Sequence, residues 1–197
     1  VAQIEDLEER EVQELDERDG AWELRCYYRP DRSSSRTKRK LVNFQRYRKA
    51  TSHGMARFLR ERGKPDLIHA HILTRPVMMA RWFSRKWDVP YVVSEQSSVY
   101  LDGTWMNKGR SAKALDRSLL EKAAEVTVVS PHLGLAMEKL KLCHAPTVVP
   151  NVIPGMDTDL PTTGPARDFM MVADLVDKTK NISGVLRALR IARSKGH

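Results

Sequence analysis

The sequence predicts an α/β protein with a parallel sheet that is covered by helices on both faces. From residue 65 onward, short apolar runs alternate with segments of helical period. The runs are continuously apolar rather than alternating, which is typical of strands buried on both sides. One helix-length segment separates neighbouring runs, and parallel strands need a crossover of that length. Ligands of such sheets bind beyond the carboxyl ends of the strands, so the residues that follow the strands are the candidates for function.

Composition restricts the class of protein. The chain has 197 residues, of which 41% are hydrophobic, and its mean hydropathy is −0.49. These values indicate a water-soluble globular protein of one domain or a little more. No apolar run approaches the roughly 18 residues of a membrane-spanning helix, and the acidic opening "VAQIEDLEER" does not resemble a signal peptide. Cys26 and Cys143 have neither metal-site nor redox-motif spacing, so we expect a cytoplasmic protein with two reduced thiols.

The positive charge of the chain is concentrated in one segment. The net charge is +9, and residues 29–64 carry thirteen lysines and arginines against two acidic residues. Such a segment suits a solvated helix face, an anionic membrane surface or nucleic acid. It contains no recognisable nucleic-acid-binding module, so we expect no nucleic-acid partner. Contact of residues 29–64 with an anionic membrane stays a hypothesis that rests on charge alone.

The N-terminal part precedes the regular repeats. Residues 12–28 alternate around an Asp-Gly pair, which predicts a hairpin with a tight turn. A short acidic helix over residues 4–15 is the alternative. Residues 30–40 predict an exposed loop, and apolar residues at helical spacing predict a helix over 41–62.

The strand–helix repeats follow in order along the chain. Strands are predicted over 66–70, 90–94, 125–130 and 146–152, and helices over 75–87, over 110–124 and from Ser130-Pro131 onward. A serine followed by proline is typical of a helix N-cap with proline in the first turn.

The last part of the chain predicts the opening of a second domain. Residues 153–167 are rich in Pro, Gly, Thr and Asp and indicate a linker. The run "DFMMVA" at 168–173 predicts a strand, 174–181 a loop and 182–196 an amphipathic helix. One strand and one helix cannot cover both faces of a sheet, so we expect a truncated first unit of that domain.

Polar residues follow the predicted strand 90–94 directly. Glu95, Gln96, Ser97 and Ser98 stand at its carboxyl end, where side chains can hydrogen-bond the hydroxyl groups of a substrate. A turn followed by a helix cap is the alternative. The residues alone leave both interpretations open.

Two histidines lie in the predicted strand 66–70 and directly after it. His69 and His71 are two positions apart and therefore point to the same face. No third ligand of suitable spacing is visible, so we expect no metal site. We expect His71 to line a cleft at the strand end and His69 to be a hydrogen-bonded core histidine.

A second candidate site lies in the loop before the last helix. Lys178, Lys180 and Asn181 precede a helix N-terminus, where free backbone amides and a lysine suit a phosphate group. The loop is not glycine-rich, and solvated lysines are the alternative.

Five stretches together resemble one known family. In order they are "PDLIHAHIL", "VPYVVSEQSSVYL", "KAAEVTVVSPHL", "VVPNVI" and "DKTKNISGVLRAL". Their order and spacing are similar to those of the glycosyltransferase family-four proteins, which are retaining, nucleotide-sugar-dependent enzymes of the GT-B fold. The bacterial members thought to build surface polysaccharides are the most similar.

The resemblance implies a domain organisation. It implies a Rossmann-like acceptor-side domain over residues 1–152, a linker over 153–167 and the start of a nucleotide-sugar-binding domain over 168–197. The glycine-containing loop of the first domain and the paired glutamates of the second have no counterpart in this sequence, so we expect the chain by itself to be inactive. The resemblance implies no cofactor and no metal.

The resemblance also implies roles for individual residues. Glu95 matches the glutamate of the family's "EH" pair, but Gln96 stands where the family has a histidine that reaches the reaction centre. A glutamine can hydrogen-bond a sugar hydroxyl but cannot titrate near neutral pH, so a positioning role is implied and proton transfer is not. Lys180 matches the lysine that contacts the donor diphosphate, with Asn181 beside it.

The leading prediction is a fragment of a retaining glycosyltransferase. The whole enzyme would move a sugar from a nucleotide-diphosphate sugar to a hydroxyl of a glycan or lipid-linked acceptor in polysaccharide biosynthesis. It would act in the cytoplasm, with a peripheral site at the inner face of the membrane. The alternative is a non-catalytic relative that binds a glycan or a membrane.

Overall fold

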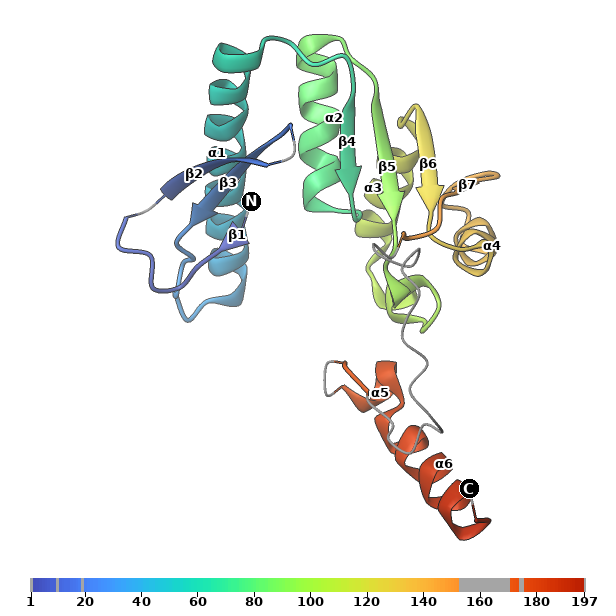
Figure 1. The fold of residues 1–197 in the computed structure, drawn as a ribbon. Helices are drawn as coiled ribbons and strands as arrows, with labels where there is room; N and C mark the ends of the chain where they lie inside the picture. The colour runs from blue at the N-terminus through green and yellow to red at the C-terminus, as the bar shows by residue number, and fades with distance from the viewer. Residues whose placement is uncertain (1, 10, 19, 153–170, 174–175, 197) are drawn as a thin grey trace. The chain divides into compact units, whose positions relative to one another are not determined.

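The computed structural model describes residues 2–9, 11–18, 20–152, 171–173 and 176–196. Contacts divide the chain into two units, Val1–Val152 and Ile153–His197, which are treated separately below. The predicted linker at 153–167 lies outside the described residues. Figure 1 shows the elements of both units.

The described residues of the first unit form two sheets and four α-helices. Its strands are β1 Ala2–Gln3, β2 Glu11–Arg18, β3 Ala21–Tyr28, β4 Ile68–His71, β5 Tyr91–Glu95, β6 Glu125–Val128 and β7 Thr147–Val148. Its α-helices are α1 Arg36–Arg62, α2 Arg75–Trp87, α3 Arg110–Glu121 and α4 Pro131–Lys139, and two 3₁₀ helices are η1 Ser98–Tyr100 and η2 Thr104–Asn107. Among the helices that the structure describes, none is long and apolar enough to cross a membrane.

The N-terminal hairpin is confirmed. Strands β2 and β3 pair antiparallel, with Arg18 opposite Ala21, and β1 pairs parallel to the far side of β3. Gly20 has φ +74°, a conformation that an L side chain rarely adopts and that a tight hairpin turn requires. The alternative helix over residues 4–15 is wrong, because its second half forms β2.

Helix α1 begins earlier than predicted. The expected loop over residues 30–40 ends at Ser35, whose Oγ accepts a hydrogen bond from the Lys38 amide at 3.4 Å and caps the helix. The Arg and Lys residues that follow are good helix formers, so their charge did not argue against a helix. The buried side of α1 packs on β3 and includes Tyr47, Ala50 and Gly54.

The second sheet is parallel, which confirms the α/β class. Of the described helices, α2, α3 and α4 pack on one face of this sheet, and the opposite face carries the exposed His69 and His71. Its order is β4-β5-β6-β7, with Ile68 opposite Tyr91 and His71 opposite Ser94. Helix α2 has the predicted bounds. Strand β6 is shorter than predicted because Ser130 caps α4, its Oγ accepting from the Leu133 amide at 3.2 Å. Strand β7 is also shorter than predicted, since Pro150 has no backbone N–H to donate to a neighbouring strand.

The apolar core lies between the sheet and its crossover helices. Alternate strand positions point toward α2, α3 and α4, and the buried set includes Ala70, Val93, Val126 and Val128 from the strands and Val77, Leu119 and Met137 from the helices. A smaller cluster joins α2 to α1 and β3 through Tyr28, Tyr47, Ala50, Met79 and Phe83. The crossovers therefore leave the carboxyl ends of β4 and β5 at one edge, followed by the loops of the predicted site.

The second unit contains two helices among its described residues. Helix α6, Ile182–Ser194, confirms the predicted helix. The predicted loop at 174–181 contains a short helix α5, Asp177–Lys180. The predicted strand at 168–173 is wrong over residues 171–173, which form no strand, and its first half lies outside the described residues. A strand forms only beside a partner strand, and the described part of this unit has none.

A close contact between α1 and β3 gives a stability prediction. A methyl group at position 54 would lie 2.5 Å from the Cys26 Sγ, which is buried. We expect Gly54→Ala to lower the free energy of unfolding by about 1–2 kcal/mol, because the clash outweighs the higher helix propensity of alanine. Urea unfolding measures this change.

The matched background is Cys26→Ala, which removes the Sγ atom. In that background we expect Gly54→Ala to be neutral or stabilising by up to about 1 kcal/mol, since only the propensity term remains. The same loss in both backgrounds would contradict a steric contact between α1 and β3.

Candidate functional site

The carboxyl edge of the sheet is organised around the Glu95 side chain. This residue ends β5 and is 0% exposed. One carboxylate oxygen accepts from the Leu73 amide at 2.8 Å and the Tyr100 hydroxyl at 2.9 Å. The other accepts from the amides of Gln96 and Ser97, each at 2.9 Å. Four donors thus satisfy a buried carboxylate that forms no ion pair with any residue the structure describes.

These hydrogen bonds join two loops that are distant in the sequence. Leu73 belongs to the loop after β4, and the other three donors follow β5. The loop after β4 is strained, because Ile72 and Thr74 have φ +66° and +101° and both are β-branched. The hydrogen bond from Leu73 to Glu95 therefore holds a backbone conformation that would otherwise relax.

Both carboxylate oxygens of Glu95 already accept two hydrogen bonds within the protein. This geometry therefore does not support a direct contact between Glu95 and a ligand. The carboxylate instead positions its neighbours. Burial, together with the negative charge of Glu95, raises the pKa of the Tyr100 hydroxyl, so Tyr100 stays a donor to the carboxylate throughout the neutral range.

The polar residues after Glu95 point outward. Gln96 and Ser98 are exposed, and Ser97 is half-buried. The Gln96 side-chain amide makes no hydrogen bond with the part of the chain that the structure describes, so both its donor and its acceptor are free for a ligand. The Ser97 Oγ lies 3.5 Å from the Val99 amide and caps η1. The helix cap that was the alternative interpretation of these residues is therefore present, and it lies beside the exposed residues of the candidate site.

The two histidines lie on the sheet face opposite the core helices. Their rings are 4.2 Å apart. The expectation of a core histidine at position 69 is wrong, because His69 is exposed on edge strand β4. Its Nε2 hydrogen-bonds the Ser94 Oγ at 2.7 Å, and Ser94 also pairs with the Thr127 hydroxyl at 2.6 Å. Partial burial and the neighbouring His71 lower the pKa of His69.

His71 is exposed at the carboxyl end of β4, on the same edge of the sheet as Gln96. Over the described ranges, no group of three or more His, Cys, Asp and Glu residues is placed to hold a metal ion.

At the second candidate site, in the second unit, part of the hydrogen-bonding capacity is already used by the protein itself. Lys180 is exposed and forms no ion pair with a described residue. Asn181 has φ +50° and begins α6. One amide of that helix start, on Ser183, already donates to the Asp177 Oδ1 at 2.6 Å, and this contact lowers the pKa of Asp177. The free helix amides expected here are therefore shared with an acidic side chain.

A second buried carboxylate was missed from the sequence. Asp116 on α3 accepts from the Trp105 indole at 2.8 Å and from the Lys108 ammonium at 2.7 Å. Trp105 is 1% exposed and lies under the cationic groups of Lys113 and Arg117. These contacts fix the loop after η1 onto α3. A tryptophan within a glycine-flanked, polar loop was the available signal.

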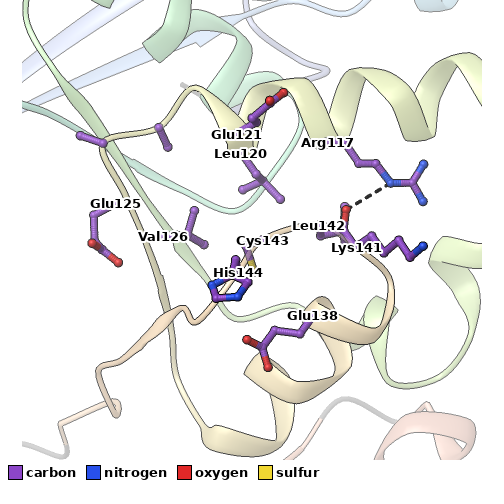
Figure 2. Close-up of a pocket in the computed structure, with 12 residues that line it drawn as sticks. Arg117, Leu120, Glu121, Glu125, Val126, Glu138, Lys141, Leu142, Cys143 and His144 are labelled. Carbon is purple, nitrogen blue, oxygen red and sulfur yellow. Dashed lines mark hydrogen bonds between the residues drawn. The ribbon is translucent and has the colours of Figure 1, made fainter.

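Another pocket lies at the opposite edge of the sheet. It measures about 690 Å³ and surrounds the amino end of β6, the end of α3 and the loop before β7 (Figure 2). Two of its polar groups serve the fold: Arg117 donates to the carbonyls of Leu140 and Lys141, and the Glu138 carboxylate accepts from the Ala145 amide. Burial raises the pKa of the Cys143 thiol to about 11, so it is not a nucleophile at neutral pH.

The fold defines a class of protein, the Rossmann-like α/β domains, which bind their ligands at the carboxyl ends of the parallel strands. The glycosyl transferase 4-like domain matches residues 7–152, and the chain belongs to that family. The match covers the whole parallel sheet with both loops that Glu95 joins, and membership of the family supports glycosyl transfer. A comparison with curated proteins finds no match.

The role of Glu95 gives a second stability prediction. In Glu95→Gln one oxygen is replaced by an NH₂ group that faces two donors, so at least two hydrogen bonds are lost and buried donors are left unpaired. We expect a loss of about 3 kcal/mol or more in the free energy of unfolding.

Tyr100→Phe is the matched control, because it removes one donor and leaves three. We expect it to cost only about 1–2 kcal/mol. Thermal or urea unfolding compares the two variants. A Glu95→Gln protein as stable as Tyr100→Phe would contradict the four-donor arrangement.

Proposed function

We propose that the protein acts in sugar transfer as part of a retaining glycosyltransferase. It takes a sugar from a nucleotide-diphosphate sugar and passes it to a hydroxyl of a glycan or lipid-linked acceptor in surface-polysaccharide biosynthesis. The observation that carries this proposal is the Glu95-centred edge of the sheet inside a glycosyl transferase 4-like domain. The donor, the acceptor and the biosynthetic pathway are all part of this proposal.

In this proposal the exposed residues of the edge contact the sugar. The Gln96 amide donates to one hydroxyl and accepts from another, while Ser97, Ser98 and His71 contribute further hydrogen bonds. Glu95 contributes by fixing the backbone from which Gln96 and Ser97 project. Gln96 holds the substrate and carries no proton, since an amide does not titrate near neutral pH.

The donor diphosphate is assigned to the second unit. Lys180 supplies positive charge against the departing diphosphate and Asn181 a hydrogen bond, which stabilises the charge that develops during transfer. No cofactor or metal takes part in the proposed reaction. Asp177 competes for the same helix start, so Lys180 carries most of the interaction.

A non-catalytic glycan- or membrane-binding role is the second candidate. It is favoured by an amide at position 96 instead of a titratable group, and by the outer face of α1. That face carries the exposed residues Lys38, Arg48, Lys49 and Arg60, and none of them forms an ion pair with a described residue. Membrane attachment through this face is compatible with both functions and would place the protein at the cytoplasmic side of the membrane.

Release of nucleoside diphosphate tests the enzymatic proposal. The protein in its full coding length is incubated with a panel of UDP- and GDP-sugars, with and without glycan acceptors. We expect turnover, and we expect Gln96→Ala to lower kcat/KM about 10- to 100-fold through the loss of hydrogen bonds worth about 1.4–2.7 kcal/mol. Gln45→Ala, an exposed glutamine on α1, is the matched control.

Absence of turnover with every donor, together with retained glycan binding, would replace the enzymatic proposal with the binding role. Turnover that Gln96→Ala leaves unchanged would remove Gln96 from the site.

Sedimentation with vesicles tests the membrane proposal. Replacement of Lys38, Arg48, Lys49 and Arg60 by Gln should weaken binding to vesicles with anionic lipid more than 100-fold, since each cation near the surface contributes about 1 kcal/mol. The control changes four exposed cations of the second unit to Gln: Arg187, Arg190, Arg193 and Lys195. An equal loss in the control would show that net charge, and not the α1 face, governs binding.

A further inference from the structure

A groove runs between helices α2 and α3, which are the crossovers between consecutive strands of the parallel sheet. Its volume is about 490 Å³, and no strand residue lines it, so it opens on the side of the helices away from the sheet. The α2 residues that line it share one face of that helix, and the α3 residues are one turn apart. The lining consists of Met78, Arg81, Trp82, Arg85 and Lys86 from α2 and Leu115 and Leu119 from α3.

The apolar part of the groove is recessed at its floor and exposed at its walls. Leu119 is 2% exposed and Met78 is half-buried, whereas Trp82 is 45% exposed and Leu115 39% exposed. A tryptophan that faces a leucine across a groove presents apolar surface that water covers poorly. Such a recess is typical of surfaces that bind a partner.

The charged groups of the groove are all cationic and all belong to α2. Arg81 Nη1 donates to the Ser118 carbonyl at 3.4 Å and to its hydroxyl at 3.0 Å, so it links α2 to α3. Arg85 and Lys86 are exposed, and neither forms an ion pair with a residue that the structure describes. The Lys86 ammonium lies 5.3 Å from the centre of the Trp82 ring. Among the lining residues none is acidic, so the groove fits an anionic partner.

The shape and composition of the groove favour a polypeptide over a membrane surface. Tryptophan, methionine and arginine are the residue types enriched in protein interfaces, and all of them line this groove. The buried floor at Leu119 can be reached by a side chain that projects from a helix, but not by a flat bilayer surface. A groove between two helices is a common receptor for an amphipathic helix.

We propose that this groove binds an acidic amphipathic helix of a partner protein. Apolar side chains at i, i+3, i+4 and i+7 of the partner would insert between Trp82 and Leu115, with Glu or Asp on one flank beside Arg85 and Lys86. The stretch from Met78 to Lys86 is about 12 Å long, which matches a partner helix of roughly two to three turns.

A partner in this groove leaves the candidate sugar site open. Arg85 and Lys86 lie in the last turn of α2, and β5 begins shortly afterwards at Tyr91. That end of α2 is therefore at the amino edge of the sheet, whereas Gln96 follows the carboxyl end of β5. The proposal does not depend on sugar transfer.

Fluorescence anisotropy of the 197-residue protein with three labelled peptides tests the chemistry of the groove. Each peptide is a stapled helix of about three turns, because a short helix is marginal in water without a staple. A peptide with the leucine stripe and glutamates on one flank should bind roughly tenfold more tightly than one with lysines there, or one with alanines in place of the leucines. Equal binding of either control peptide, or no binding of the first, would overturn the proposal.

Substitutions on α2 locate the binding. Arg85→Gln with Lys86→Gln should weaken binding of the acidic peptide roughly tenfold, and Trp82→Ala should do the same. Arg39→Gln with Lys40→Gln is the matched control, since it removes a neighbouring Arg-Lys pair from exposed positions of α1, and it should change binding less than about twofold. Equal losses in the two double variants would overturn the assignment to the groove.

Nuclear magnetic resonance on the unsubstituted protein gives a readout that is independent of how any variant folds. The acidic peptide should shift the indole N–H signal of Trp82 and leave that of Trp22, on β3, unchanged. Vesicles of phosphatidylglycerol separate the remaining source of negative charge. If such vesicles shift the Trp82 signal and the acidic peptide does not, the groove is a membrane contact and the proposal is overturned.

Discussion

The buried carboxylate of Glu95 is the interaction on which the carboxyl edge of the sheet depends. Its four hydrogen bonds come from two loops that the chain separates by helix α2 and strand β5. A buried charge without a counter-ion is tolerated only when every oxygen is fully hydrogen-bonded. The loops can therefore not move independently, and the strained backbone at Ile72 and Thr74 is retained.

A second buried carboxylate, Asp116, fixes the segment beyond η1 in a similar way. It holds Trp105 and Lys108 against α3, so the segment after β5 is fixed at both of its ends. Around the pocket of Figure 2, at the opposite edge, Arg117 and Glu138 are instead committed to hydrogen bonds with the backbone. Gln96, whose side-chain amide bonds to no described residue, lies at the carboxyl edge, where ligands of parallel sheets bind.

Sequence patterns predicted those features that depend on local periodicity. Helix α2, the parallel strands and the N-terminal hairpin follow from apolar spacing and turn residues. The sequence could also place Glu95 at a strand end, but it could not show that the side chain turns inward, because burial depends on donors from Leu73 in another loop. The prediction that His69 lies in the core was wrong for a related reason. Whether a side chain on a strand is covered depends on the strand beside it and not on its own sequence. Residues 171–173 formed no strand because a strand needs a partner.

Amide hydrogen exchange at Leu73, Gln96 and Ser97 tests most directly whether one carboxylate holds both loops. In the unsubstituted protein these loop amides should exchange slowly, although they belong to no ladder between strands. In Glu95→Ala, which removes both acceptor oxygens, all three should lose protection together, including Leu73 on the other loop. Protection of Leu73 that survives the substitution, or amides that respond separately, would contradict the coupling of the two loops through Glu95.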